Sequence, residues 1–411
     1  MMKKTNLSML FPILWLSICT HQSSSDSLSD SVLSITTGTS QFALELLQAT
    51  SVEAGKFMNV AISPFSVWTV LALVREGSGG KTSSQLQKAL HLHESNRAIR
   101  AAYRKLNRVI HVSGSGVEMI GANVLFTDIN RPLQLDFQYL AERIYKSAVH
   151  PVNFMNPSAT ADLINQWVAN VTHNRITQLV HEEDMKDPHL VIANGNFFKG
   201  KWLLPFNSSN TIREKFYDDK GIELGEVEMM YQHSHFRYSR ISELGAKVVE
   251  LPYEGGQFSM IVVVPIGSTT IDALLERMSK MSMEKIYHHM TTEDEAYPDA
   301  FVEVYLPRVV INSDFVLNKA LEKLGIIDVF NDAKADLSRI SPHSIHLHKL
   351  IHKAEIVINE EGTTASSITG GIMSDRQTMP KIHANRPFAF FIVENSLKVI
   401  VFAGKVVNPH M

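Results

Sequence analysis

Cysteine is almost absent from this chain: Cys19 is the single cysteine among 411 residues. A network of disulfides within the chain is therefore excluded, and stability has to come from a buried core, which a chain of this length can form. The other bulk properties are those of a folded globular protein, with 45% hydrophobic and 20% charged residues. Apart from an apolar stretch near the N-terminus, no run of about 18 apolar residues occurs, so we expect no membrane anchor.

Excess positive charge is also lacking, because the formal net charge is −3. Proteins that bind nucleic acid through its phosphates usually carry strong positive charge. We therefore expect no general nucleic-acid binding.

The motifs of several enzyme classes are missing as well. The chain contains no Gly-x-Ser-x-Gly and no His-Glu-x-x-His. The segment EGSGGKT at 76–82 lacks the first glycine of a phosphate-binding loop and follows a helical pattern, which predicts a glycine-rich helix stop. Four histidines lie close in sequence without a second ligand group at metal-site spacing, so we predict no metal site and no cofactor. They are His343, His346, His348 and His352.

The N-terminus has the layout of a secretory signal peptide. Lys3 and Lys4 precede the apolar run Leu7–Ile18, and small or polar residues follow. We expect residues 1–19 to be removed, with an end point near Cys19, and the mature protein to be secreted and extracellular. Residues 20–40 are rich in Ser and Thr, with Asp and Gly among them, which predicts a flexible segment.

Two sites fit the acceptor pattern for N-linked glycans, Asn170-Val-Thr and Asn207-Ser-Ser. In a secreted chain we expect each to carry a glycan where it is exposed.

Hydrophobic periodicity predicts an α+β protein. Helical patterns dominate the first part of the chain, whereas strand patterns dominate after Trp202, without a regular alternation of the two. Among the later elements we predict a strand at 301–311 and a helix at 314–324. No internal repeat or linker is found, so residues 41–411 are expected to form one domain.

The helix predicted over 97–110 carries its arginines on one face and its apolar residues on the other. No acidic residue occurs from Arg97 through Val117, so nothing local neutralises them. Two interpretations stay open: a solvated helix face, or a binding site for a polyanion such as a heparin-like sulfated polysaccharide. The four arginines are Arg97, Arg100, Arg104 and Arg108.

An unusual loop lies close to the C-terminus. A strand pattern at 355–360 is followed by small, polar or glycine residues, among which one arginine, Arg376, stands out. Alternate residues of a strand share a face, and here every second residue is small, so the segment is suited to enter a sheet over a packed interior. The set comprises Thr363, Ala365, Ser367, Thr369 and Gly371.

Six stretches of the chain together resemble the signature blocks of the serpins, a family of serine protease inhibitors. They occur in the order and spacing of that family and cover the chain from Gln41 onward; 172–175, THNR, is a small departure. The stretches are NVAISPFSVW at 59–68, NQWV at 165–168, VIANGNFFKGKW at 191–202, VELPYEGG at 249–256, HKAEIVINEEGTTAS at 352–366 and RPFAFFIVEN at 386–395.

The resemblance implies a single-domain fold with helices packed on three β-sheets and an exposed reactive loop at about 360–380. It implies a monomer that is not an enzyme: a protease cleaves the loop, forms an acyl-enzyme and is trapped covalently when the loop inserts into the main sheet. The hinge of that loop corresponds to Glu360, Glu361, Gly362, Thr363, Thr364, Ala365, Ser366 and Ser367.

The family spacing places the scissile bond between Arg376 and Gln377; cleavage after Met373 or Lys381 breaks that spacing. Arginine suits a specificity pocket with a carboxylate at its base, so trypsin-like serine proteases are the expected partners. A serpin that no longer inhibits, such as a carrier or a chaperone, is the alternative.

Two further groups of residues match structural positions of the family. One lies under the point where the sheet opens, and the other forms an upper gate in which an ion pair between Glu360 and Arg308 is expected. The first group is Ser63, Ser66, Asn194 and His352, and the second is Trp202, Arg308 and Glu360.

Overall fold

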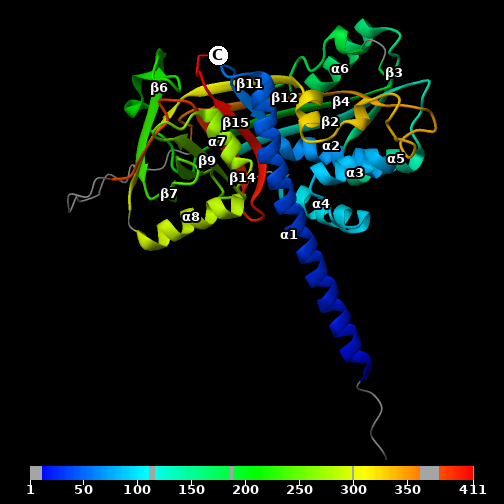
Figure 1. The fold of residues 1–411 in the computed structure, drawn as a ribbon, viewed down its shortest axis with the longest axis horizontal. Helices are drawn as coiled ribbons and strands as arrows, with labels where there is room; N and C mark the ends of the chain where they lie inside the picture. The colour runs from blue at the N-terminus through cyan, green and yellow to red at the C-terminus, as the bar shows by residue number, and fades with distance from the viewer. Residues whose placement is uncertain (1–11, 111–115, 186–187, 299, 362–378, 411) are drawn as a thin grey trace, which may run out of the picture.

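The computed structural model describes residues 12–110, 116–185, 188–298, 300–361 and 379–410, with side chains from residue 29 onward. Its helices are α1 (Pro12–Ala54), α2 (Pro64–Glu76), α3 (Gly80–Ala89), α4 (Asn96–Ile110), α5 (Leu135–Tyr139), α6 (Pro157–Val171), α7 (Ile271–Met278), α8 (Met283–Ala296) and α9 (Asn318–Lys323). Figure 1 shows how they surround the sheets.

A five-stranded sheet forms the main body of the fold. Its order is β11 (Val309–Val316), β12 (Leu347–Ile358), β4 (Leu190–Gly200), β2 (Val117–Asp128) and β3 (Ala148–Val152). The central neighbours β4 and β12 run parallel, with Leu347 opposite Leu190 at one end and Val357 opposite Lys199 at the other.

Two other sheets complete the architecture. The six-stranded sheet has the order β1 (Val60–Ile62), β15 (Val399–Val406), β14 (Phe388–Glu394), β9 (Phe258–Pro265), β8 (Ala246–Pro252) and β7 (Tyr238–Ile241). The four-stranded sheet has the order β13 (Lys381–His383), β10 (Val302–Pro307), β6 (Glu223–Ser234) and β5 (Ile212–Tyr217). The predicted α+β fold, with helices on three sheets, is therefore confirmed.

The five-stranded sheet separates two hydrophobic cores. Because successive side chains of a strand point to opposite faces, β4 serves both. Ile192 lies in the larger core, whereas Val191 and Ala193 lie in a smaller one together with Ile164 and Val168 of α6. In Figure 1, α2 and α6 lie on opposite sides of this sheet.

The N-terminal segment differs from the expectation of a flexible lead-in, because residues 20–40 belong to α1. Val32 and Ile35 are buried in the larger core. The hydroxyls of Thr36 and Thr39 donate to the carbonyls of Leu33 and Ile35, each at 2.9 Å. The polar composition concealed this helix because its Ser and Thr residues are accommodated by such local bonds.

The boundaries of the strands and the helix around Arg308 also differ from those predicted from the sequence. The single strand predicted over 301–311 is divided there: β10 belongs to the four-stranded sheet and β11 to the five-stranded sheet. The helix predicted from residue 314 begins only at Asn318, because 314–316 pair with β12. Strand β12 itself begins at Leu347, well before the predicted strand at 355–360. Sequence patterns reveal a strand but not the sheet that it joins.

None of the helices within the described ranges combines the length and the apolar character needed to cross a membrane.

Candidate functional site

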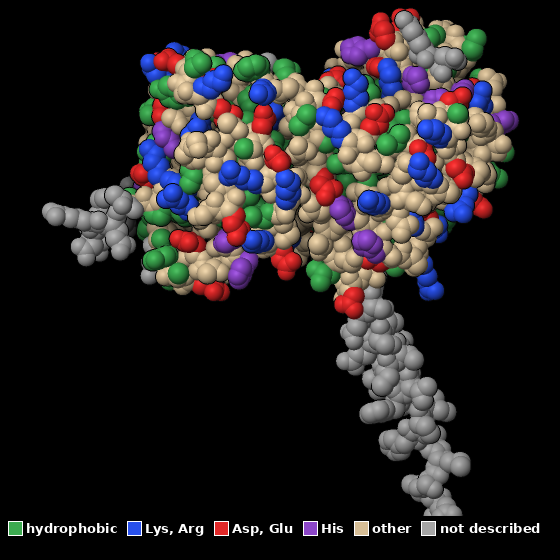
Figure 2. Space-filling view, in the orientation of Figure 1, with side chains coloured by type: hydrophobic (Ala, Val, Ile, Leu, Met, Phe, Trp, Pro, Cys, Tyr) green, Lys and Arg blue, Asp and Glu red, His purple; other side chains and the backbone are tan. Residues whose placement is uncertain are grey.

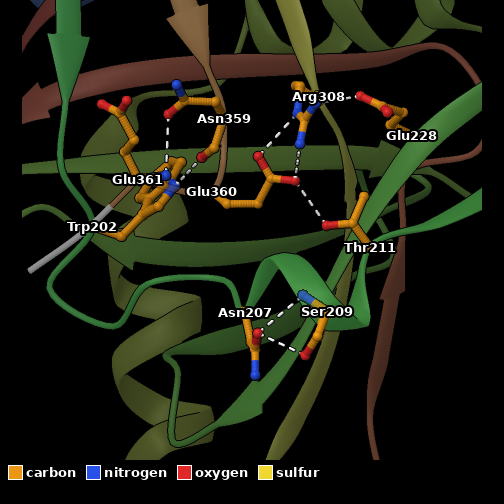
Figure 3. A network of polar contacts seen from close by, with 9 residues as sticks. All are labelled: Trp202, Asn207, Ser209, Thr211, Glu228, Arg308, Asn359, Glu360 and Glu361. Carbon is orange, nitrogen blue, oxygen red and sulfur yellow. Dashed lines mark hydrogen bonds and ion pairs between the residues drawn. The ribbon is translucent and has the colours of Figure 1, made fainter. Parts of the chain in front are cut away.

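Glu360, Arg308 and Thr211 meet where the chain leaves β12 (Figure 3). Arg308 Nε donates to Glu360 Oε2 at 2.9 Å, and its Nη2 donates to Oε1 at 2.5 Å. The hydroxyl of Thr211 donates to the same Oε1 at 2.8 Å. Glu228 accepts a further bond from Arg308 Nη1. The ion pair expected between Glu360 and Arg308 is therefore present, and it is bidentate, which is the strong geometry for an arginine with a carboxylate.

Burial and pairing act in opposite directions on the charge of Glu360. Its side chain is 12% exposed, and burial alone disfavours the carboxylate. The hydrogen bonds from Arg308 and Thr211 outweigh that effect and lower the pKa of Glu360. The same bond to Glu360 raises the pKa of Arg308. The pair is therefore ionised at neutral pH.

Trp202 fixes the backbone just beyond β12 (Figure 3). Its indole Nε1 donates to the carbonyl of Asn359 at 2.7 Å, and its backbone N–H donates to the carbonyl of Glu361 at 3.0 Å. Lys199, near the end of β4, forms an ion pair with Glu361 at 2.6 Å. The indole is held by stacking on Tyr253, with ring centroids 4.5 Å apart. The three residues predicted as an upper gate thus meet at the segment just beyond β12. Trp202 and Lys199 tie this segment to the end of β4, whereas Arg308 ties Glu360 to the junction of β10 and β11.

A buried polar network crosses the middle of the same two strands. His352 of β12 and Asn194 of β4 are partners in register, and His352 Nδ1 and Asn194 Oδ1 are 2.6 Å apart. The amide of Asn194 donates to Ser66 Oγ at 2.6 Å, and the backbone N–H of Ser63 donates to His352 Nε2 at 3.0 Å. All four residues predicted for this cluster therefore lie together, with α2 fastened against the sheet from below.

The network determines the charge and tautomer of His352. Its side chain is fully buried, and desolvation lowers its pKa to about 3. Because Nε2 accepts from Ser63, the proton of the neutral ring is assigned to Nδ1, which donates to Asn194. The ring is therefore a neutral bridge between β12, β4 and the start of α2.

Two asparagines of this network were missed from the sequence. Asn123 of β2 is directly opposite Asn194 in the ladder and accepts at 2.7 Å from Ser66 Oγ. Asn196 donates to Asn194 Oδ1. A polar residue in a strand that is otherwise buried is a signal for such a partner, but only the register across the sheet identifies which residues meet.

The basic helix requires a correction. Nothing near Arg100 in sequence neutralises it, yet its guanidinium binds the carboxylate of Glu76, with Nε 2.9 Å from Oε1. Glu76 comes from α2, its side chain is 1% exposed, and it also accepts a bond from Tyr145. Arg100 therefore holds a buried carboxylate. Exposed positions are taken by Arg97, Arg104 and Arg108.

The other predicted positions fall into two groups. Asn170 and Asn207 are both exposed, as glycosylation requires. The reactive bond and most of the hinge lie outside the described residues: Arg376, Gln377, Gly362, Thr363, Thr364, Ala365, Ser366 and Ser367.

The four clustered histidines occupy different environments. His352 belongs to the buried network, whereas His346 lies beside two groups that the sequence did not associate with it, Asp332 and His189. His189 comes from a segment distant in sequence, whereas Asp332 precedes His346 by 14 residues.

Comparisons with known proteins agree on one family. The family model described as serpin (serine protease inhibitor) matches residues 37–409. Leukocyte elastase inhibitor A of Mus musculus is 33% identical over 90% of this chain and 97% of its own length. Human antithrombin-III is 30% identical over 90% of this chain and 81% of its own. The crystal structure of Manduca sexta serpin-12 covers 91% of this chain and 99% of its own, with a TM-score of 0.79 and 27% identity.

The buried, neutral His352 predicts a specific loss of stability in mild acid. Its pKa of about 3 in the folded state lies below the value of 6.5 expected for a free histidine, so below pH 6.5 the unfolded chain binds a proton that the folded chain does not. Stability therefore falls as pH falls from 6.5 toward 3, and this residue alone removes about 2 kcal/mol between pH 7 and pH 5.

Urea unfolding at both pH values checks this, with His352→Gln as the comparison because glutamine does not titrate there. The drop in unfolding free energy should be about 2 kcal/mol smaller in the variant. Equal drops in the two proteins contradict a buried neutral imidazole.

Proposed function

The chain belongs to the serpin family, and from this premise we propose that it is a secreted suicide-substrate inhibitor of trypsin-like serine proteases. It is cleaved between Arg376 and Gln377, its loop inserts between β4 and β12, and the protease is trapped covalently. The observation that carries the proposal is that polar contacts bridge β4 and β12 at two levels of the seam between these strands. Trp202 and Lys199 bind the carbonyl of Asn359 and the carboxylate of Glu361 just beyond β12, and Asn194 binds His352 in the middle.

The pairing of β4 with β12 suits an inserted strand. The two strands are parallel, and parallel pairing is slightly less stable per residue than antiparallel pairing. A segment that turns back after β12 runs antiparallel to both, so it replaces one parallel ladder with two antiparallel ones. The fourteen residues that follow Gly362 up to Arg376 span about 46 Å when extended, and the twelve residues of β12 span about 40 Å. The loop is therefore long enough to fill the seam.

The residue at the cleaved bond sets the protease class. A long cationic side chain at 376 suits a specificity pocket with a carboxylate at its base. The set of small residues at alternate positions from Thr363 favours an inhibitor over the alternative, a carrier or chaperone of the same family, because large or charged residues there could not be buried.

Secretion rests on the N-terminal sequence, where Lys3 and Lys4 precede an apolar run. It also fits the exposed acceptor sites at Asn170 and Asn207. The chain acts on its protease as a monomer and carries out no catalysis of its own.

Trypsin tests the proposed bond. Mixed with the purified protein, trypsin should form a complex that survives a denaturing gel, and Arg376→Ala should slow complex formation on the order of 100-fold or more, since a lost charged contact in a buried pocket costs about 2–5 kcal/mol. Met373→Ala is the matched control and should keep the wild-type rate. A cleaved loop with fully active trypsin in the wild-type reaction contradicts the inhibitor proposal.

A separate test shows which face of the hinge becomes buried on insertion. Thr363→Arg places a charge on the face that must be buried, so the protein should still be cleaved but should no longer trap trypsin. Thr364→Arg, one residue further on the opposite face, should retain most trapping. Loss of trapping in both variants, or in neither, contradicts the predicted face. The measurement is the ratio of trapped to cleaved inhibitor on a denaturing gel.

We also propose a heparin-like polyanion as a ligand of α4. On the face that Figure 2 shows, basic and acidic side chains are largely interspersed, so a polyanion needs a local group of cations. Arg97, Arg104 and Arg108 are exposed and supply one.

Arg104→Ala should lower the salt concentration that elutes the protein from a heparin column, with little change in stability. Arg100→Ala should instead destabilise the fold by about 2–3 kcal/mol, because it leaves the buried carboxylate of Glu76 unpaired. Unchanged elution of Arg104→Ala leaves α4 as a solvated helix face.

A further inference from the structure

Two histidines meet at the end of the β4–β12 pair that lies opposite Glu360. His189 and His346 immediately precede the first paired residues of these strands, Leu190 and Leu347. Their rings lie edge to face, with centroids 5.5 Å apart. The carboxylate of Asp332 joins them, with its Oδ1 3.2 Å from His346 Nδ1.

The three side chains form a donor set suited to a metal ion. One ligand atom from each lies within 4.8 Å of the others. Imidazole nitrogens with a carboxylate are typical of Zn²⁺ sites, whereas Mg²⁺ and Ca²⁺ prefer oxygen ligands throughout. Donor atoms on one tetrahedral Zn²⁺ are roughly 3.3 Å apart, so these groups have to approach one another by about 1.5 Å at most. The side chain of Asp332 is 72% exposed, and it can turn toward an ion that enters from solvent.

Charges around the three residues permit a cation. The ammonium of Lys349, three residues beyond His346 in the sequence, is paired with Asp184 at 2.8 Å, so its charge is neutralised locally.

We propose that His189, His346 and Asp332 bind one Zn²⁺ ion, and that the ion ties the base of β4 to the base of β12. The consequence for inhibition rests on the proposed function. Neighbouring strands are about 4.8 Å apart, so a strand inserted between β4 and β12 roughly doubles the separation of their bases. One ion cannot bind both histidines across that gap. Zinc therefore opposes the last part of loop insertion, and more of the cleaved inhibitor releases active protease.

Calorimetric titration of the metal-free, full-length protein with ZnCl₂ tests the site. One ion should bind, and His346→Ala should weaken binding about 100-fold or more by removing a ligand. His343→Ala is the matched control, since it removes an exposed histidine of the same segment, and it should keep the wild-type affinity. Absence of saturable binding, or unchanged affinity in His346→Ala, overturns the site.

The consequence is measured as the fraction of inhibitor that traps trypsin, in EDTA and in saturating ZnCl₂. Zinc should lower this fraction in the wild-type protein and in His343→Ala but not in His346→Ala, which also corrects for any effect of zinc on trypsin. If zinc binds without changing the trapped fraction, the proposal that zinc opposes loop insertion is wrong.

Failure of the proposed function gives a different pattern. If the wild-type protein traps no trypsin in EDTA, the inhibitor proposal is wrong. The zinc link between the bases of β4 and β12 is then tested by thermal unfolding instead. Zinc at a hundredfold excess over its Kd should then raise Tm by about 3 °C in the wild-type protein and not in His346→Ala. If Tm does not rise in the wild-type protein, the proposed zinc link between β4 and β12 is wrong.

Discussion

The fold depends on one seam, the parallel pairing of β4 with β12. Three groups of side chains bridge it along its length: Trp202 and Lys199 with the residues just beyond β12 at one end, the bond between His352 and Asn194 in the middle, and the contact of His189 with His346 at the other end. Each group has a partner on or beside both strands, so each must change if the strands separate. Together with the backbone ladder and the apolar packing on both faces of the sheet, these polar contacts fix the two strands to each other at three defined points.

Each of these contacts has its own sensitivity to the surroundings. His352 is buried and neutral, so its bonds weaken only when acid unfolds the chain. The pair of Lys199 with Glu361 is partly exposed and is weakened by salt. The group at the base joins two imidazoles to a carboxylate, a combination that metal ions bind. The energy needed to open the seam is therefore divided among hydrogen bonds, an ion pair and a metal-binding group.

Sequence reasoning found the residues that follow family blocks but not those that depend on contacts across the fold. The ion pair of Glu360 with Arg308 was expected, because both residues match gate positions of the family. Asn123, Glu76 and His189 were not connected to their partners, because strand register and helix packing bring them together from distant segments. Charge counted within one helix missed that Arg100 is neutralised from α2. Composition alone likewise misjudged residues 20–40, where Val32 and Ile35 anchor a Ser- and Thr-rich helix in the core.

A reversible cross-link between β4 and β12 tests most directly whether the seam has to open. Lys199 and Val357 are partners in register and both half-buried, and Cys19 is the single native cysteine, so Lys199→Cys with Val357→Cys offers one disulfide across the seam. The same double variant is mixed with trypsin in its oxidised and reduced forms. The account predicts that the oxidised form is cleaved without trapping and that reduction restores the covalent complex. Equal trapping by both forms contradicts insertion between β4 and β12.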